Sequence, residues 1–169
     1  MTTLSAKVRI DAPRDVVWDA LADFGGTWKY NPNVTTSRSL SEANSGVGAE
    51  RHCDLTFAGA TVQERILEWD DGEGYALEIY DGDKLPPIKN IIARLSVSEE
   101  NGHTVAEGTM SYDTKFGPIG WIMDRLMVRT QFGRAWQGIF AGLKHHAETG
   151  DLVEKGVRLP FDEVVRAAA

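Results

Sequence analysis

Hydrophobic and polar residues alternate along most of the first two thirds of the chain, a pattern that predicts half-buried β-strands. Residues 4–10 place leucine, alanine, valine and isoleucine on one face and serine, lysine and arginine on the other. The same period predicts six further strands, at residues 34–41, 48–57, 61–69, 74–81, 88–98 and 104–116. Turn-forming segments such as EANSG, DDGEG and EENGH connect them, so consecutive strands are expected to pair as an antiparallel meander.

Helical spacing is confined to two regions. After a proline suited to a first helical turn, Val17, Leu21 and Phe24 recur at i, i+4 and i+7. A Gly-Gly pair at residues 25–26 ends this helix and leaves room for at most a short second one. A long helix is predicted over about residues 118–148, where large apolar residues fall along one stripe.

The order of elements is therefore one strand, two small helices, six strands and one long helix. This order predicts an α+β fold in which a curved seven-stranded antiparallel sheet wraps around a long C-terminal helix. Because one helix cannot fill the concave face of such a sheet, an internal apolar cavity is expected. Residues 1–149 form this single domain, and residues 150–169 follow as a tail in which Pro160 favours the start of a short helix that runs to Ala168.

Two charged residues fall on the inward face of the predicted sheet. Strand parity places Arg51 and Glu64 inward, among apolar neighbours on the two strands that flank TFAGAT. An unpaired ionised group in such surroundings is costly, so the two are expected to form a pair. Three roles are open: the pair orients a ligand carbonyl or hydroxyl, Glu64 acts as a base on an acidic C–H, or the pair is purely structural.

Aromatic and sulfur-containing side chains supply further candidates. Tyr112 is inward on the last strand, where it either donates to a ligand oxygen or sits as an ordinary half-buried tyrosine. Trp28 and Tyr30 follow the glycine hinge and form either the rim of the cavity entrance or permanent core. Methionines such as Met110 and Met127 suit an adaptable apolar wall, and core filling explains them equally well.

Composition narrows the class of partner. The formal net charge of -7 argues against nucleic acid or an anionic membrane surface. No apolar run approaches the roughly 20 residues that span a bilayer, so stable membrane insertion is not expected. The N-terminus lacks a signal-peptide pattern and the chain has one cysteine, which favours a cytoplasmic location. The sequence leaves monomer and homodimer open.

The sequence predicts neither a metal site nor a cofactor. The four histidines do not converge, since His52 points outward, His103 lies in a turn and His145 and His146 are adjacent on a helix. Cys53 has no inward histidine partner, and no glycine-rich phosphate loop is present.

Several segments, in their order and spacing, resemble the START/Bet v 1-like (SRPBCC) superfamily, and within it the polyketide cyclase/dehydrase and lipid-transport proteins. The segments are APRDVVWDALADFGGTWKYNPNV, GVGAERHCDL, VQERILEWDDGEGYALEI, LPPIKNIIARLSV and GLKHHAE, which together cover roughly residues 5–148. The resemblance implies a helix-grip fold with a hydrophobic pocket between the sheet and the C-terminal helix. It also implies binding or carriage of sterols, lipids, hormones or polyketides, with a minority of members acting as cyclases or dehydratases.

Two of these segments also resemble the plant abscisic-acid receptors. In those receptors the glutamate at the position of Glu64 lines the ligand pocket, and residues 57–61 and 83–87 correspond to the gate and latch loops. Thr36 stands where the receptors have the lysine that meets the hormone's carboxylate, and the gate lacks its proline, which argues against hormone sensing. Parity and resemblance together give the expected ligand contacts: Trp28, Tyr30, Arg51, Cys53, Leu55, Phe57, Val62, Glu64, Ile66, Leu77, Ile79, Ile91, Ala93, Met110, Tyr112, Phe116, Met127, Trp136 and Ile139.

Three functions fit these residues. The first is a non-enzymatic binder or carrier of a small, largely apolar molecule, such as a lipid, isoprenoid or polyketide intermediate, oriented by Arg51, Glu64 and Tyr112. The second is a polyketide aromatase/cyclase or dehydratase in which Glu64 or Tyr112 moves a proton. The third is an interaction domain with a vestigial cavity. One carboxylate and one tyrosine are fewer polar groups than catalysis requires, so the sequence favours the carrier.

Overall fold

The computed structural model describes residues 1–115, 122, 125, 128–160 and 164–165 of the chain. Its helical elements are α1 (Arg14–Ala22), the 3₁₀ helix η1 (Phe24–Lys29) and α3 (Arg129–Thr149). Its strands are β1 (Thr2–Ile10), β2 (Val34–Ser39), β3 (Glu50–Leu55), β4 (Thr61–Asp70), β5 (Gly74–Asp83), β6 (Ile88–Glu100), β7 (His103–Thr114) and β8 (Val164–Val165). The seven predicted strands are all present, and the tail adds the two-residue β8.

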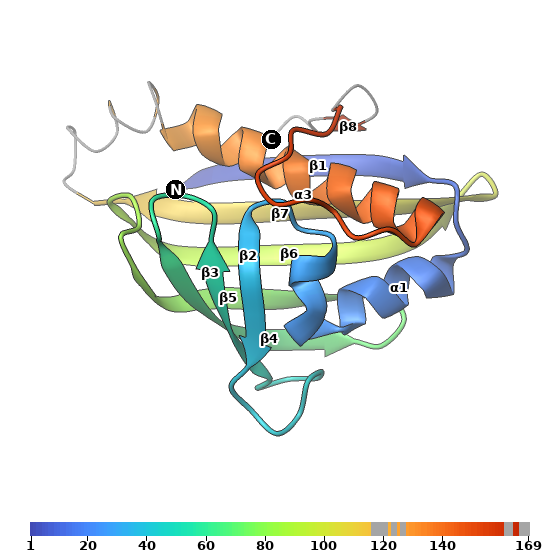
Figure 1. The fold of residues 1–169 in the computed structure, drawn as a ribbon, viewed down its shortest axis with the longest axis horizontal. Coiled ribbons are helices and arrows are strands. Elements are labelled where there is room, and N and C mark those ends of the chain that lie inside the picture. Colours follow the sequence, from blue (N-terminus) through green and yellow to red (C-terminus); the bar gives the residue numbers. More distant parts are fainter. Residues whose placement is uncertain (116–121, 123–124, 126–127, 161–163, 166–169) are drawn as a thin grey trace.

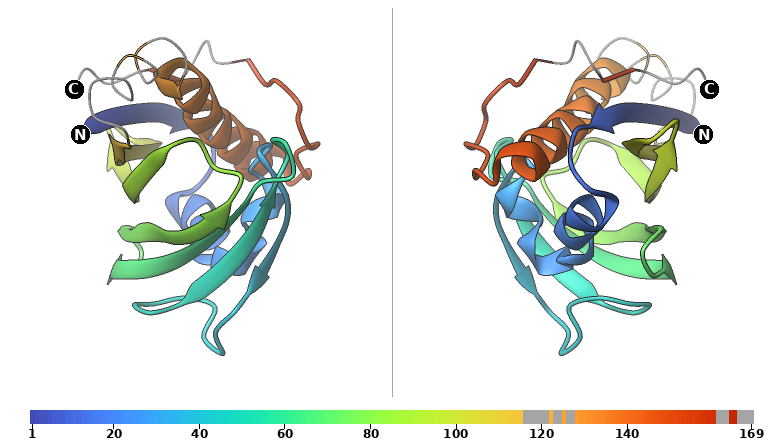
Figure 2. Two further views of the ribbon diagram at one scale, coloured as in Figure 1. Left: turned by 90° about the vertical axis from the view of Figure 1, so that its left-hand side faces the viewer. Right: turned by 90° about the vertical axis from the view of Figure 1, so that its right-hand side faces the viewer.

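The strands form one antiparallel sheet in the order β2-β3-β4-β5-β6-β7-β1-β8. From β2 to β7 each strand pairs with its neighbour in the sequence, which confirms the predicted meander. The sheet curves around α3, and α1 and η1 lie against the same concave side (Figures 1 and 2). The predicted order and arrangement of elements are therefore confirmed.

A row of apolar side chains crosses the concave face from one strand to the next. Ile66 of β4 is opposite Leu77 of β5, which is opposite Ala93 of β6. Ala93 in turn is opposite Met110 of β7, and Met110 is opposite Leu4 of β1. All five belong to the main hydrophobic core or pack against it. The alternation read from the sequence therefore places the interior correctly.

Two glycines, Gly108 on β7 and Gly142 on α3, allow close contact between the helix α3 and the rest of the domain. Trp136 donates its indole N–H to the carbonyl of Gly108 on β7, and a Cβ at Gly108 would lie 2.8 Å from Cζ of Phe140. A Cβ at Gly142 would lie only 1.9 Å from the carbonyl oxygen of Tyr30, just after η1. Glycine at these positions allows the helix to lie directly on β7 and on the loop after η1.

The segment after α3 folds back over η1. The backbone N–H of Val153 donates to the carbonyl of Lys29 at 2.9 Å, and the Val153 side chain is buried. Lys155 donates its ammonium to the carbonyl of Trp28 and lies 5.2 Å from the centroid of the Trp28 ring. The first part of the tail is therefore packed against the domain.

The prediction of a short helix from Pro160 to Ala168 is wrong at Val164 and Val165. These two residues pair antiparallel with Val8 and Lys7, and Val164 is buried in the main core. The edge of β1 offers unpaired backbone groups, and β-branched valines favour an extended conformation. Strand pairing with β1 is therefore more favourable at these two residues than a helical turn. Residues 161–163 and 166–169 lie outside the described residues.

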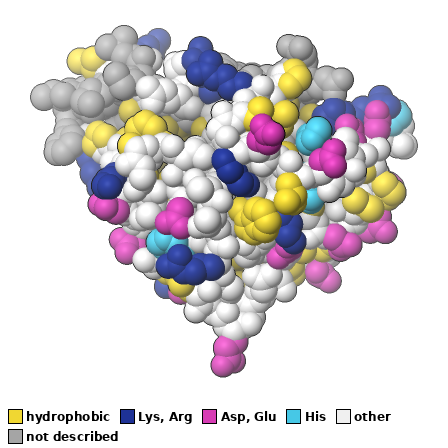
Figure 3. Space-filling view, in the orientation of Figure 1, with side chains coloured by type: hydrophobic (Ala, Val, Ile, Leu, Met, Phe, Trp, Pro, Cys, Tyr) yellow, Lys and Arg dark blue, Asp and Glu magenta, His cyan; other side chains and the backbone are white. Residues whose placement is uncertain are grey.

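The surface is mixed in character. Acidic, basic and hydrophobic side chains are interspersed on the face shown in Figure 3, so this face presents no continuous basic region. Within the described residues, no helix is both long enough and apolar enough to cross a membrane. Two expected ligand contacts, Phe116 and Met127, lie outside the described residues.

Candidate functional site

Arg51 and Glu64 face each other inside the domain. They are opposite residues of the β3–β4 ladder, and their side chains are 7% and 11% exposed. Arg51 donates from Nε to Oε2 of Glu64 and from Nη1 to the carbonyl oxygen of Phe24, at 2.7 Å in the second case. The guanidinium carbon also lies 3.9 Å from the centroid of the Phe24 ring. The predicted inward pair is confirmed, and it also attaches η1 to the sheet.

Two buried tyrosines lie near the pair. Burial raises the pKa of Tyr30, and raises that of Tyr75 more strongly, while the Arg51 charge acts in the opposite direction on both. Both hydroxyls therefore stay protonated near neutral pH. Tyr75 was not among the residues predicted for the site, although the parity that places Leu77 and Ile79 inward also places Tyr75 inward.

The Cys53 thiol completes this polar group. Its Sγ lies 3.8 Å from Oε2 of Glu64, and burial, followed by the Glu64 charge, raises the pKa of the thiol to about 12. A thiol that is both buried and protonated is a poor nucleophile. Cys53 is therefore not a candidate for covalent catalysis.

We expect Cys53 to resist alkylation in the folded protein. At about pH 8, a thiol of this pKa is almost entirely protonated, and it is shielded from the reagent. Mass spectrometry after treatment with iodoacetamide should find little label on the native chain and full label after unfolding. A Thr109→Cys variant, whose new thiol lies on the exposed face of β7, should be labelled once in the native state. Labelling of native Cys53 as fast as of the unfolded chain would contradict the prediction.

The inward surface next to Glu64 is apolar and incompletely covered. Glu64 is opposite Ile79 of β5, which is opposite Ile91 of β6. Ile79 packs against all three hydrophobic clusters of the described interior, yet it is only partly buried. Leu55 on β3 and Met110 on β7 are also inward and only partly buried. Some apolar surface therefore stays accessible beside the charged pair.

Tyr112 belongs to a different part of the interior. It is fully buried, clusters with Ile88 and Ile91, and its ring centroid lies 5.8 Å from that of Phe132 on α3. The strands β5 and β6 lie between Tyr112 and Glu64. The inward orientation predicted for Tyr112 is confirmed, but the structure does not bring it together with the charged pair.

The remaining expected contacts divide into three groups. Most are core residues whose ligand contact stays a prediction: Cys53, Val62, Ile66, Leu77, Ile91, Ala93 and Trp136 are buried, and Ile139 is partly buried. Trp28 is half-buried beside Lys155, whereas Tyr30 is part of the main core and not of a rim, because α3 lies directly on its backbone at Gly142. Phe57 is 57% exposed on the β3–β4 loop, which turns it away from the interior.

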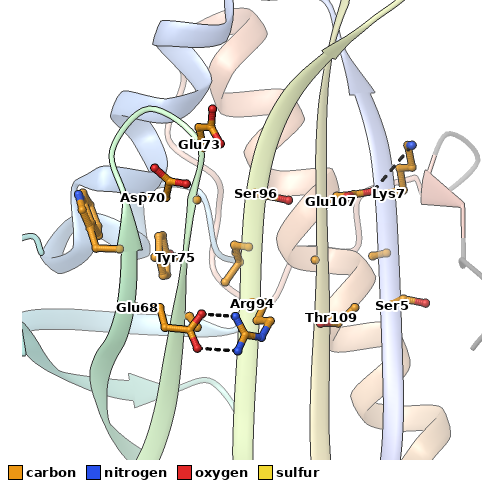
Figure 4. A pocket seen from close by; sticks show the side chains of 16 residues that line it. Ser5, Lys7, Glu68, Asp70, Glu73, Tyr75, Arg94, Ser96, Glu107 and Thr109 are labelled. Carbon is orange, nitrogen blue, oxygen red and sulfur yellow. Dashed lines mark hydrogen bonds and ion pairs between the residues drawn. The ribbon is translucent and has the colours of Figure 1, made fainter. Parts of the chain in front are cut away.

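A hollow of about 640 Å³ lies on the outer face of the sheet (Figure 4). Arg94 forms two hydrogen bonds with Glu68, at 2.5 and 2.7 Å, across Ala76, which is opposite both residues in the ladder. Lys7 pairs with Glu107 at 3.7 Å in the same hollow. Arg94 and Lys7 each have an acidic partner there, and Asp70 and Glu73 add further charge to the lining, so this hollow is a poor site for an apolar molecule.

No three His, Cys, Asp or Glu side chains among the described residues gather in a way that could hold a metal ion. The acidic residues around the outer hollow include Glu68, Asp70, Glu73 and Glu107 (Figure 4). Glu68 is engaged by Arg94, and Glu107 by Lys7.

Solved structures share this fold at low sequence identity. A protein of Thermus thermophilus matches with a TM-score of 0.71 and 17% identity, covering 86% of this chain and 97% of its own. XoxI from Bacillus cereus matches with a TM-score of 0.69 and 17% identity, covering 87% of this chain and 96% of its own. Ara h 8.0201 matches with a TM-score of 0.69 and 18% identity, covering 86% and 97%. The structural similarity establishes the Bet v 1-like helix-grip fold, and at identities this low it establishes the fold alone.

The sequence itself identifies the family. Among curated proteins, no sequence matches this chain. The family described as "Polyketide cyclase / dehydrase and lipid transport" matches residues 1–148, from β1 to the last turn of α3. Since the match spans strands β1 to β7 and the helix that they grip, the chain belongs to the polyketide cyclase/dehydrase and lipid-transport family.

Proposed function

We propose that this protein binds or carries a small hydrophobic molecule between its sheet and α3. The observation that carries the proposal is a set of apolar side chains that pack on the interior clusters and yet are only partly buried: Leu55, Ile79, Met110 and Ile139. Of these, Ile79 is directly opposite Glu64 in the ladder. Apolar surface gains about 25 cal/mol per Å² when a ligand removes it from water. Membership of a family that includes lipid-transport proteins supports the same conclusion.

Catalysis as a cyclase or dehydratase is the weaker candidate. A proton-transfer site requires groups that converge on one substrate atom. Here Oε2 of Glu64 is already bonded to Arg51, Tyr112 is separated from Glu64 by the two strands β5 and β6, and the Cys53 thiol is protonated. One charged pair beside apolar surface fits a polar anchor for a carried molecule better than a set of catalytic groups.

Enlarging Met110 should remove the binding site. A Met110→Trp indole would occupy the accessible surface next to Ile79, so we expect the Kd of a neutral fluorescent probe such as N-phenylnaphthylamine to rise by at least about tenfold. The matched control is Thr109→Trp, which puts the same ring on the adjacent, outward position of β7 and should leave binding unchanged. Native mass spectrometry of the purified protein would identify a ligand retained from the cell.

Two results would count against this function. The first is the absence of saturable probe binding to the wild-type protein. The second is equal binding by the Met110→Trp and Thr109→Trp variants, since that would place the probe outside the sheet–helix interior.

A further inference from the structure

We propose that the interior selects molecules whose polar end is neutral, such as an alcohol, ketone or ester, and discriminates against carboxylates such as free fatty acids. The proposal rests on the function proposed above and adds the chemical class of the ligand. Arg51 and Glu64 are the residues that set this preference. The preference follows from their charge, their unused hydrogen-bonding atoms and their place beside the apolar surface.

The charges of Arg51 and Glu64 balance each other. Among the buried residues that the structure describes, Arg51 and Glu64 are the charged ones, and they are paired with each other. The Phe24 carbonyl oxygen also accepts from Arg51, and the Phe24 ring lies against its guanidinium. An incoming carboxylate would place a second negative charge beside a cation that is already neutralised. Charges removed from water are tolerated when each has a partner of opposite sign. Two negative charges that share one guanidinium are therefore unfavourable.

Glu64 and Arg51 also have side-chain atoms that are not used in hydrogen bonds within the described part of the chain. Glu64 uses Oε2 for Arg51 and for Cys53, and Oε1 accepts no hydrogen bond from the described residues. Arg51 uses Nε and Nη1, and its Nη2 makes no hydrogen bond to that same part of the chain. Neither of these atoms is among the described side-chain atoms that are both fully buried and unpaired. The pair therefore retains one acceptor and one donor, which match a hydroxyl or a carbonyl.

The charged pair lies next to apolar surface that is only partly buried. Glu64 is directly opposite Ile79, the partly buried residue that contacts all three hydrophobic clusters. A molecule lying over Ile79 and Met110 would bring its polar end to Glu64 and Arg51. There a hydroxyl could donate to Glu64, and a ketone or ester carbonyl could accept from Nη2 of Arg51 without adding charge. A carboxylate would instead bring a second negative charge beside Glu64.

The test is a competition experiment with ligands that differ only at the polar end. Decanol, methyl decanoate and decanoate would each displace N-phenylnaphthylamine from the wild-type protein at about pH 8, where a carboxyl group is ionised. We expect the alcohol and the ester to compete at concentrations at least about tenfold lower than decanoate. The methyl ester isolates the effect of charge, since it has the same acyl chain as decanoate.

The Glu64→Gln variant tests whether the Arg51–Glu64 pair causes the preference for neutral ligands. The amide oxygen still accepts from Arg51, but the negative charge is gone, so the guanidinium is free to meet a ligand carboxylate. The ratio of decanoate to decanol inhibition constants should fall by at least about tenfold. Glu68→Gln is the matched control, because Glu68 is on the same strand, is paired with Arg94 and lies on the outer face, and it should leave the ratio unchanged.

Each outcome separates the two proposals. If the probe does not bind saturably, the proposed function fails and the selectivity fails with it. If the probe binds but wild-type protein treats decanoate, its ester and decanol alike, the binding function stands and the selectivity is overturned. A folded Glu64→Gln variant with the wild-type ratio would overturn the role of the pair. If that variant does not fold, the comparison of ester with carboxylate on wild-type protein still decides.

Discussion

Replacing Glu64 with leucine should lower the free energy of unfolding by about 3–5 kcal/mol. The substitution removes the carboxylate but leaves the Arg51 guanidinium buried, with the Phe24 carbonyl oxygen as its remaining hydrogen-bond acceptor in the structure. A buried charge without a counter-charge is far more costly than a buried apolar side chain. Urea denaturation followed by tryptophan fluorescence would measure the change.

The double variant Arg51→Met/Glu64→Leu separates the charge from the packing. Removing both charges should restore most of the stability lost in Glu64→Leu, because paired charges are often replaceable by apolar side chains of similar size. Glu68→Leu is the surface control, since its partner Arg94 stays in contact with water, and it should change stability little. A double variant no more stable than Glu64→Leu would show that the charge of Arg51 is not what makes the single substitution costly.

Replacing Gly142 with alanine should destabilise the protein by about 2–3 kcal/mol. The new methyl group would lie 1.9 Å from the carbonyl oxygen of Tyr30, and a backbone atom in a packed loop cannot move aside as a flexible side chain can. The helix α3 would have to shift away from the loop after η1. Thermal and urea unfolding of the variant would measure the loss.

Helix propensity predicts that Gly142→Ala raises the free energy of unfolding, whereas the contact with Tyr30 predicts that it lowers it. The experiment therefore decides between the two effects. In an exposed helix, alanine is favoured over glycine by about 1 kcal/mol, so propensity alone predicts that Gly142→Ala stabilises α3. The difference in stability between Arg134→Ala and Arg134→Gly, at an exposed position of the same helix, measures that propensity in this protein. A Gly142→Ala variant as stable as the wild type would mean that α3 is not held against Tyr30 as described.

The sheet was predictable because its signal is local. Strand parity needs only a few consecutive residues, and it correctly placed Arg51, Glu64 and Tyr112 inside. The same parity also places Tyr75 inward, but parity alone does not show that its hydroxyl lies near the charged pair, because that depends on contacts with η1 and β3. The pairing of Arg51 with Glu64 was also predictable, since their strands form a hairpin and buried charges require partners.

Features that depend on distant segments were not predictable in the same way. Tyr30 lies in the core, and α3 carries a glycine where it contacts the Tyr30 backbone, but nothing near Tyr30 in the sequence indicates this contact. A bulge between Ile66 and Glu68 shifts the register of β4, and beyond it Trp69 stacks on Tyr75 with ring centroids 5.8 Å apart. A two-residue strand such as β8 is too short to show any period.

The strand β8 also limits how two copies of this protein can share a sheet. An unpaired edge strand is a template for a second chain, and at Lys7 and Val8 the tail of the same molecule already occupies that edge. The opposite edge is β2, where exposed polar residues such as Thr35 and Arg38 border a backbone that, among the described residues, has a strand partner on one side only, namely β3. Continuous sheet growth is therefore open at β2, whereas at Lys7 and Val8 of β1 a partner would first have to displace β8.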